Sequence, residues 1–450
     1  MECSEISENS FGEDSLGNLL NSIQITTSSS FVPVKPDGNI RPLEENDFKD
    51  FVSRVECNLR ELISNLSELI YLLRDVSQHV TVFSNAGNDV VVPLILLCGE
   101  HRKPNSWNSE NTVNNVNEIL QLLCKLCSCK QLSDILLETS TIGGKKFGAL
   151  LKPCLLSLRP KLLKDTWKTF PAAIACFQWI LNEVKAPYLS DYFDIILPTA
   201  LIIVDDFQTE NQLRGILCLQ HIVENVTCAE LGWHGRGDVV FQALQRVLYE
   251  REPALVGPLV SCLALLLDKL ERARFSLEKD HAWCRYDDVL EVYLRNMEME
   301  GRPALRRAYL GALPHLLEAT GVAVVRWSRR LLRILQEYGE AAGQTERGMA
   351  VAVLQALKTY MKLARPRVRD HATIVFSVVL RLLYDATVLP CTDDSHEGES
   401  LMKPLEECLA VLAETVPDEA RKIAVQLKTQ ARFNNKFDAV VDSVLAPFCS

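Results

Sequence analysis

Two adjacent carboxylates, Asp205 and Asp206, are the residues whose types and spacing come nearest to acid–base or metal chemistry. Paired carboxylates can act as general acid and base. His221 and Glu224 are three residues apart, a spacing that ligates metal ions in some helical bundles when a second such motif is present. No second motif is evident. Acids between two helices more often stabilise the N-terminus of the following helix, so we expect no catalytic residue, metal or cofactor.

The fifteen cysteines invite a second chemical interpretation. Cys124, Cys127 and Cys129 include the C-x-x-C spacing of a zinc site, but partner ligands at a usable spacing are missing. The glycine- and lysine-containing stretch 142–146 lacks the remaining residues of a phosphate-binding loop. Most cysteines stand singly in leucine-rich segments, which is typical of free buried thiols and of a reducing compartment.

The carboxylate pair lies in the stretch 190–226, which predicts two helices joined by a short acidic corner. Pro198 lies inside the first helix, where it removes a backbone donor and predicts a kink. Thr209 and Gln212 have the spacing of a capping box at the start of the second helix. Gly215 is small enough to allow close approach of a neighbouring helix. A hairpin of this size must stack on others to bury its apolar face.

Similar helix pairs recur along the chain, and their first helices begin near residues 190, 239 and 287. That interval is close to the HEAT/armadillo period of about 40–47 residues. No alternating strand pattern of useful length is present. We therefore predict an all-α protein, an α-solenoid of HEAT/armadillo-like helical hairpins, which is a fold that usually binds other proteins.

The charge is unevenly distributed along the chain. Residues 1–45 are rich in Ser, Asn, Glu and Gly and predict a disordered acidic head. Helical repeats are expected over 46–185 and again over 186–450. The net charge of −10 argues against nucleic-acid binding, and the longest apolar runs are about half of a membrane span. No signal peptide is recognisable, so we expect no membrane anchor and a cytoplasmic and nuclear location.

Exposed cations and one tryptophan are the candidate contacts with a partner protein. Arginines are concentrated between residues 301 and 370, and arginine is enriched at interfaces. The alternative is a set of solvated helix faces paired with nearby glutamates, each pair contributing little. The candidate partner-binding residues are Trp233, Arg306, Arg307, Arg326, Arg329 and Arg330.

The stretch 190–310 resembles a known family. The resemblance rests on the run LYEREPALVGPLVSCLALLLDKLE and on a set of residues before it: Pro198, Asp205, Asp206, Gly215, Leu219, His221 and Asn225. The family is that of the second TEL-two-interacting protein. The resemblance implies a non-enzymatic subunit of the TTT complex, together with the TEL-two protein and the first TEL-two-interacting protein. It further implies that this complex acts as a co-chaperone with Hsp-ninety and its adaptor. Together they would stabilise phosphatidylinositol-3-kinase-related kinases, which act in DNA-damage and growth signalling.

Two other functions fit parts of the same pattern. A karyopherin-like transport adaptor would also be a HEAT-repeat protein, and it would bind a Ran-type GTPase. An enzyme or metal protein would use Asp205, Asp206 and His221, and metal analysis of the purified protein would test it.

Overall fold

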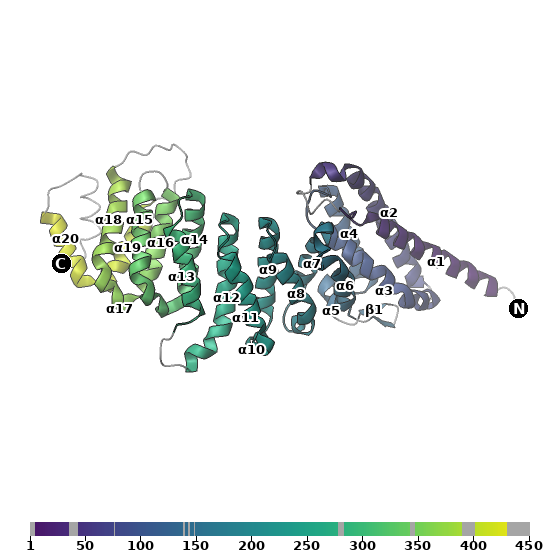
Figure 1. Cartoon of the computed structure of the whole chain (residues 1–450). Helices are drawn as coiled ribbons and strands as arrows, with labels where there is room; N and C mark the ends of the chain where they lie inside the picture. The colour runs from purple at the N-terminus through teal and green to yellow at the C-terminus, as the bar shows by residue number, and fades with distance from the viewer. Residues whose placement is uncertain are drawn as a thin grey trace. The chain divides into compact units, whose positions relative to one another are not determined.

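The computed structural model describes residues 5–35, 44–75, 77–137, 140–142, 145–147, 149–277, 283–342, 347–388 and 401–429. The chain divides into two compact units (Figure 1). The first unit comprises Met1–Asp205 with Glu224–Val226, and the second comprises Asp206–Val223 with Thr227–Ser450. The domain boundary expected at residues 185 and 186 stays a prediction.

The first unit is a helical cluster with one small hairpin of strands. Its helices and strands are α1 (Glu5–Ser30), η2 (Glu45–Phe48), α2 (Lys49–Asp75), α3 (Ser77–Glu100), α4 (Glu110–Leu126), α5 (Leu132–Leu137), β1 (Ser140–Ile142), β2 (Lys145–Phe147), α6 (Leu151–Leu158), η3 (Arg159–Leu162), η4 (Trp167–Thr169), α7 (Pro171–Glu183), η5 (Tyr188–Tyr192) and α8 (Phe193–Val204). The strands pair antiparallel, with Ser140 opposite Phe147. They are too short to show an alternating pattern in the sequence.

Helix α3 is the centre of the first unit. It contacts α1, α2, α4, α6 and α7, and its second half from Val90 to Glu100 is buried except at Pro93. An apolar sequence on all sides, VVVPLILLCG, suits a helix that is surrounded by others.

The prediction of disorder over residues 1–45 was wrong for residues 5–30, which form α1. Leu16, Leu20 and Ile23 are spaced by four and three residues and are buried where α1 packs against α2 and α3. Polar residues of α1 also bond to α2, since Asn65 Nδ2 donates to Ser22 Oγ at 3.2 Å. The polar sequence therefore folds because its narrow apolar stripe and its hydroxyl groups both find partners on neighbouring helices.

The end of α1 is fixed to the end of α3 by two buried polar residues. The backbone N–H of Val32 donates to Glu100 Oε2 at 2.9 Å, and His101 Nε2 lies 3.1 Å from the carbonyl oxygen of Ser30. Burial raises the pKa of Glu100, and the ion pair with Lys161 at 3.5 Å opposes that shift. Burial lowers the pKa of His101 to about 4, so its imidazole is neutral at pH 7.

Close contact between α3 and α7 depends on Gly99. A Cβ at Gly99 would overlap Cys176 Sγ and would lie 2.8 Å from Trp179 Cε3. We expect Gly99→Ala to lower the free energy of unfolding by about 1–3 kcal/mol, because the overlap forces α7 to shift. Gly257→Ala is the matched control, since nothing lies within 4 Å of the added methyl group. It should stabilise by about 0.5–1 kcal/mol through helix propensity. Urea denaturation of both variants measures the difference, and equal midpoints would contradict the close contact.

The second unit is an array of helical hairpins. Its helices are α9 (Thr209–Asn225), α10 (Cys228–Gly232), η6 (Trp233–Gly235), α11 (Arg236–Val247), α12 (Pro253–Leu277), α13 (Arg285–Glu298), α14 (Pro303–Thr320), η7 (Gly321–Trp327), α15 (Ser328–Ala342), α16 (Arg347–Leu363), α17 (Arg365–Val368), η8 (Arg369–His371), α18 (Ala372–Val388), α19 (Met402–Thr415) and α20 (Pro417–Thr429). The last two residues of α9 belong to the first unit.

The hairpins of the second unit stack in two layers. One layer contains α12, α14, α16 and α19, each packed on the next, and α13, α15 and α18 form the same series in the other layer (Figure 1). The first helices of the hairpins begin at Arg236, Arg285, Ser328 and Ala372. Those intervals are within or close to the HEAT/armadillo period of about 40–47 residues. The predicted all-α solenoid is confirmed.

Buried polar side chains tie successive hairpins together. Asn296 Nδ2 donates to the carbonyl oxygen of Leu248 at 2.7 Å, which joins α13 to the end of α11. Tyr338 Oη donates in the same way to Met297 at 2.7 Å and joins α15 to the end of α13. Both acceptors lie at helix C-termini, where carbonyl groups lack their usual partner four residues on, and the Met297 carbonyl also accepts from the backbone N–H of Glu300 at 3.3 Å. The two side-chain bonds therefore fix the position of each hairpin on its neighbour.

Two segments of the second unit are apolar and long enough for a membrane span by length and composition. They are Pro253–Glu271, which is 50% buried, and Pro303–Ala342, which is 39% buried. The second is not one continuous helix, because Gly321 has a φ of 62° at the end of α14. The first packs against α11 and α14 as a core helix. The absence of a membrane anchor stays a prediction.

Candidate interaction surfaces

The residues around the carboxylate pair are placed at two helix ends. Pro198 lies inside α8 on its exposed side, and Asp205 is the C-terminal cap of that helix. Asp206 is buried, and its Oδ2 accepts a hydrogen bond from Asn211 Nδ2 at 2.8 Å. Asp206 therefore bonds to a side chain in the first turn of α9, and stabilisation of that helix N-terminus by the carboxylate pair stays a prediction.

The second helix of this stretch begins one residue earlier than the predicted capping box of Thr209 and Gln212 requires. Helix α9 begins at Thr209, and the backbone N–H groups of Asn211 and Gln212 both donate to the carbonyl oxygen of Gln208 at 3.0 Å. The residue before the helix is therefore Gln208 and not Thr209. Its side chain takes part as well, since Gln208 Oε1 accepts from Asn211 Nδ2 at 3.0 Å.

The remaining residues of this stretch belong mainly to the core. Gln212, Gly215 and Leu219 are buried in α9, whereas His221 is half-buried and Glu224 is exposed. Close approach at Gly215 stays a prediction. Within the described ranges, no group of three or more His, Cys, Asp or Glu side chains is arranged to hold a metal ion.

Three of the predicted partner-binding arginines make contacts within the chain. Arg326 Nη1 lies 2.5 Å from Asp287 Oδ2, and the side chain of Asp287 is fully buried. The other oxygen of Asp287 accepts from Trp327 Nε1 at 2.9 Å. Asp287 also caps its own helix by accepting from the backbone N–H of Cys284 at 3.0 Å. Arg326 is thus part of the packing between α13 and η7.

Arg330 and Arg306 bond in the same way to neighbouring hairpins. Arg330 Nη2 lies 2.6 Å from Glu298 Oε2, and Arg333 Nη2 lies 2.7 Å from the other oxygen of that carboxylate. The hydrogen bond from Arg330 lowers the pKa of Glu298. The guanidinium of Arg306 lies 4.6 Å from the ring centre of Tyr338 and donates to the carbonyl oxygen of Glu300.

Arg306, Arg326 and Arg330 therefore pair with carboxylates of the same chain. The partner of Arg326 is the fully buried Asp287, not a glutamate on a solvated helix face. The side chains of Arg307 and Arg329 are exposed. Contact of these two residues with a partner stays a prediction. Sequence spacing could not separate the two groups, because the carboxylates involved lie 31 to 39 residues away.

Trp233 lies on the surface, as the sequence suggested. It begins η6, in the connection that precedes α11, and is 61% exposed. His234 and Gly235 follow with φ values of 56° and 67°. This left-handed pair turns the chain sharply into α11 and holds the tryptophan in the connection. Its contact with a partner stays a prediction.

Two further exposed apolar residues lie at the hairpin corners and were missed. Tyr249 follows α11 and is 61% exposed, and Met299 follows α13 and is 69% exposed. Their corners are adjacent, because Arg302 Nη2 donates to the carbonyl oxygen of Arg251 at 2.9 Å. We call these two residues and Glu250, Arg251 and Arg302 the corner edge. The sequence contains a pattern that could have identified these two corners. YEREP and MEGRP both place a large apolar residue and a glutamate at the start of a corner that ends in proline.

Comparison with known proteins agrees with the sequence resemblance. Residues 154–338 match the model of the Tti2 family. Human TELO2-interacting protein 2 is 33% identical over 256 residues, which cover 57% of this chain and 50% of the relative. The rat protein of the same name is 31% identical over 323 residues, covering 71% of this chain and 62% of the relative. The chain thus spans about half to three fifths of the curated relatives it matches.

Solved structures support the fold. Importin beta has a TM-score of 0.51 at 14% identity, covering 92% of this chain and 46% of that one. Yeast importin-beta (Kap95p) has a TM-score of 0.50 at 14% identity, covering 88% and 45%. At such identities the likeness concerns the helical-repeat fold alone. The resemblance expected over 190–310 is confirmed, and the similarity to the Tti2 family extends on both sides of that stretch, over residues 154–338.

Proposed function

We propose that this chain is a non-enzymatic scaffold subunit of the TTT complex. It would bind the TEL-two protein and the first TEL-two-interacting protein. Through the Hsp-ninety co-chaperone machinery, it would help to stabilise and mature phosphatidylinositol-3-kinase-related kinases. We place this activity in the cytoplasm and the nucleus.

The observation that supports this proposal most is the position of the family match. Residues 154–338 include α11 to α14 and most of α15, which are stacked helical hairpins. Relatives over this region are named for their interaction with TELO2. Helical-repeat arrays present extended surfaces to other proteins. A binding role for the matched hairpins therefore fits both the fold and the relatives.

We assign partner contact to the corner edge of the second unit. Tyr249 and Met299 are exposed on adjacent corners inside the matched region, with glutamate and arginine side chains around them. Aromatic residues, methionine and arginine are the types enriched in protein interfaces. Large apolar side chains repeated along one edge would bury their area against a partner that follows the array.

Affinity purification tests the proposal. The tagged full chain is expressed in cells, and the proteins bound to it are identified by mass spectrometry. Recovery of the TEL-two protein and the first TEL-two-interacting protein is expected, and absence of both would refute the assignment. Recovery of a Ran-type GTPase in their place would favour the karyopherin-like alternative, for which the structural likeness supplies only the fold.

Charge substitution at the corner edge tests the contact surface. Tyr249→Asp with Met299→Asp should reduce recovery of the TEL-two protein about tenfold or more, because truncation of a buried anchor costs 2 kcal/mol or more. Tyr71→Asp is the matched control, since Tyr71 is 67% exposed on α2 and lies outside the family match. It should leave recovery unchanged. Normal recovery by the double variant would place the interface elsewhere while leaving complex membership intact.

A further inference from the structure

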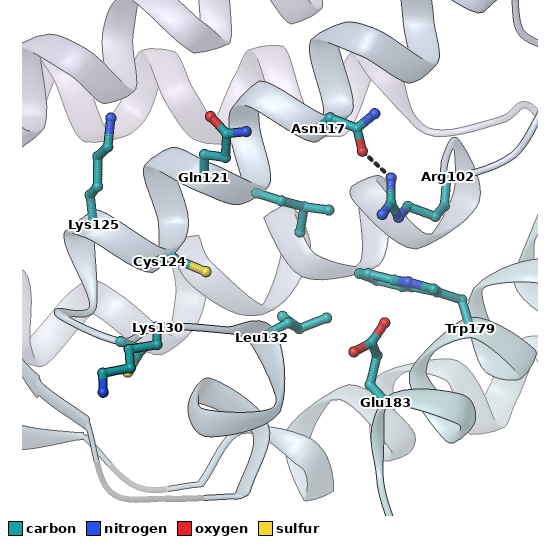
Figure 2. A pocket seen from close by; sticks show the side chains of 11 residues that line it. Arg102, Asn117, Gln121, Cys124, Lys125, Lys130, Leu132, Trp179 and Glu183 are labelled. Carbon is teal, nitrogen blue, oxygen red and sulfur yellow. Dashed lines mark hydrogen bonds between the residues drawn. The ribbon is translucent and has the colours of Figure 1, made fainter.

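The first unit contains an open pocket of about 750 Å³ that the family match does not explain. Nine of its eleven lining residues precede residue 154, where the match begins. Its walls come from α4, from the start of α5 with the residues before it, and from α7, and Arg102 closes one end (Figure 2). Three separate segments thus converge on one hollow.

Helix α4 presents a polar ridge along this pocket. Asn117, Gln121 and Lys125 are spaced by four residues, which places them on one side of a helix. Asn117 accepts a hydrogen bond from Arg102, and the side chain of Gln121 is exposed. Amide side chains offer both donors and acceptors. The ridge can therefore bond to the backbone of a chain lying along α4.

The cations of the pocket outnumber its accessible acids. Arg102, Lys125 and Lys130 line it together with one carboxylate, Glu183. Among the described residues, none of these three cations forms an ion pair within the chain. Asp134 lies nearby, but its Oδ2 accepts from the backbone N–H groups of Lys130 and Gln131 at 3.2 and 3.1 Å. The pocket therefore has positive charge available in a chain whose net charge is −10.

The floor of the pocket is apolar. Trp179 is half-buried, with one ring edge close to Gly99 of α3, and its ring reaches the hollow beside Leu132 (Figure 2). A fixed aromatic surface beside cations is typical of the anchor points of protein interfaces. Cys124 and Cys129 complete one end. Burial raises the pKa of Cys124, so its thiol is protonated at pH 7 and is not a nucleophile.

The geometry points to this pocket as a binding site for an acidic peptide segment of a partner protein. Aspartate or glutamate side chains of the segment would pair with Lys125, Lys130 and Arg102, and one apolar side chain would pack on Trp179. Pockets for small molecules are lined mostly by apolar groups, whereas six of the eleven residues here carry a charge or an amide. That composition suits a polar peptide. The site goes beyond the proposed function, because it lies largely outside the matched hairpins.

Fluorescence anisotropy with the purified full chain tests this site. The probe is a short fluorescein-labelled peptide of Asp and Glu around one central Leu, and we expect it to bind. The same peptide with Asn and Gln in place of the acids should bind about tenfold more weakly or not at all. Lys125→Glu with Lys130→Glu should also weaken binding about tenfold or more, because like charges then face each other. Gln121→Glu should weaken it by adding a negative charge to the ridge.

Lys152→Glu with Lys164→Glu is the matched control. Both lysines are exposed in the first unit outside the pocket, and the change in net charge is the same. Unchanged binding by this variant supports the site, whereas an equal loss would show a general effect of net charge and would overturn it. No binding of the acidic peptide would also overturn the proposal. Displacement of the probe by inorganic phosphate at equal concentration would assign the pocket to a small anion.

Discussion

Replacing Asp287 by alanine is expected to lower the free energy of unfolding of the second unit by about 3 kcal/mol. Its carboxylate is fully buried and bonds to Arg326, to Trp327 and to the backbone N–H of Cys284. Removing one partner of a buried ion pair costs about 3–5 kcal/mol, because the other charge is left without compensation. The lower value applies because the side chain of Arg326 is 30% exposed and regains water.

Two further variants define the origin of that loss. Asp287→Asn keeps an acceptor for Trp327 and removes the charge, so it should lose less stability than the alanine variant. Glu291→Ala breaks a surface pair with Arg295 on the same helix and should cost about 0.3–0.5 kcal/mol. Urea denaturation followed by circular dichroism measures all three. A loss in Asp287→Ala no larger than in Glu291→Ala would show that the buried bonds contribute no more than an exposed ion pair.

Acid is expected to destabilise the first unit through His101. Burial lowers the pKa of this imidazole from 6.5 to about 4 in the folded chain. Between these pH values the unfolded chain binds a proton that the folded chain excludes, so stability falls as pH falls from about 6.5 to about 4. A shift of this size corresponds to about 3 kcal/mol. The loss should appear at the α1 anchor, because His101 contacts Ser30.

Comparison with His101→Gln isolates this contribution. The glutamine can still donate to the carbonyl oxygen of Ser30 and takes up no proton in this range. Glu100 acts in the opposite direction, because its raised pKa favours the folded state as pH falls, but it is present in both proteins. The measurement is the melting temperature at several pH values. Parallel pH profiles for the two proteins would exclude His101 as the source of acid sensitivity.

The repeat architecture was predictable because it follows from the local periodicity of apolar residues in the sequence. Each hairpin of the second unit needs an apolar stripe on both helices, and those stripes recur at the intervals seen between Arg236, Arg285 and Ser328. Proline follows the corners after Tyr249 and Met299 and marks the first turn of the next helix. The apolar stripe of a helix, the corner that ends in proline and the repeat interval are all properties of short segments. They can therefore be recognised directly in the sequence.

Helix α1 was not predictable in the same way. Its serines, threonines, asparagines and glycines give little helix propensity. Among the side chains of α1 that the structure describes, which begin at Ser15, the buried large apolar residues are Leu16, Leu20 and Ile23. Such a segment becomes a helix when tertiary packing supplies the stabilisation that its local helix propensity does not provide. The bonds to Asn58 and Asn65 of α2 belong to that packing. Composition alone therefore favoured disorder.

The roles of the arginines depended on stacking as well. The partners of Arg326 and Arg330 are Asp287 and Glu298 on the preceding hairpin. A sequence shows that both charges exist, but their pairing follows from the angle at which one hairpin lies on the next. The corner edge was missed for a related reason, because exposure of Tyr249 and Met299 is decided by the fold. The three-dimensional structure was therefore needed to identify the partners of the arginines and to recognise the corner edge as a candidate contact surface.

The ties between hairpins have a consequence for insertions and deletions. Asn296 reaches Leu248 from one side of α13, and Tyr293 of the same helix bonds to Tyr309 at 2.7 Å. One residue added between Tyr293 and Asn296 would turn one side chain by about 100° relative to the other, so that both bonds could not form at once. Changes of length in related chains should therefore be confined to the connections between helices. The spacing of the buried tyrosines and asparagine would be the part of each repeat that evolution keeps constant.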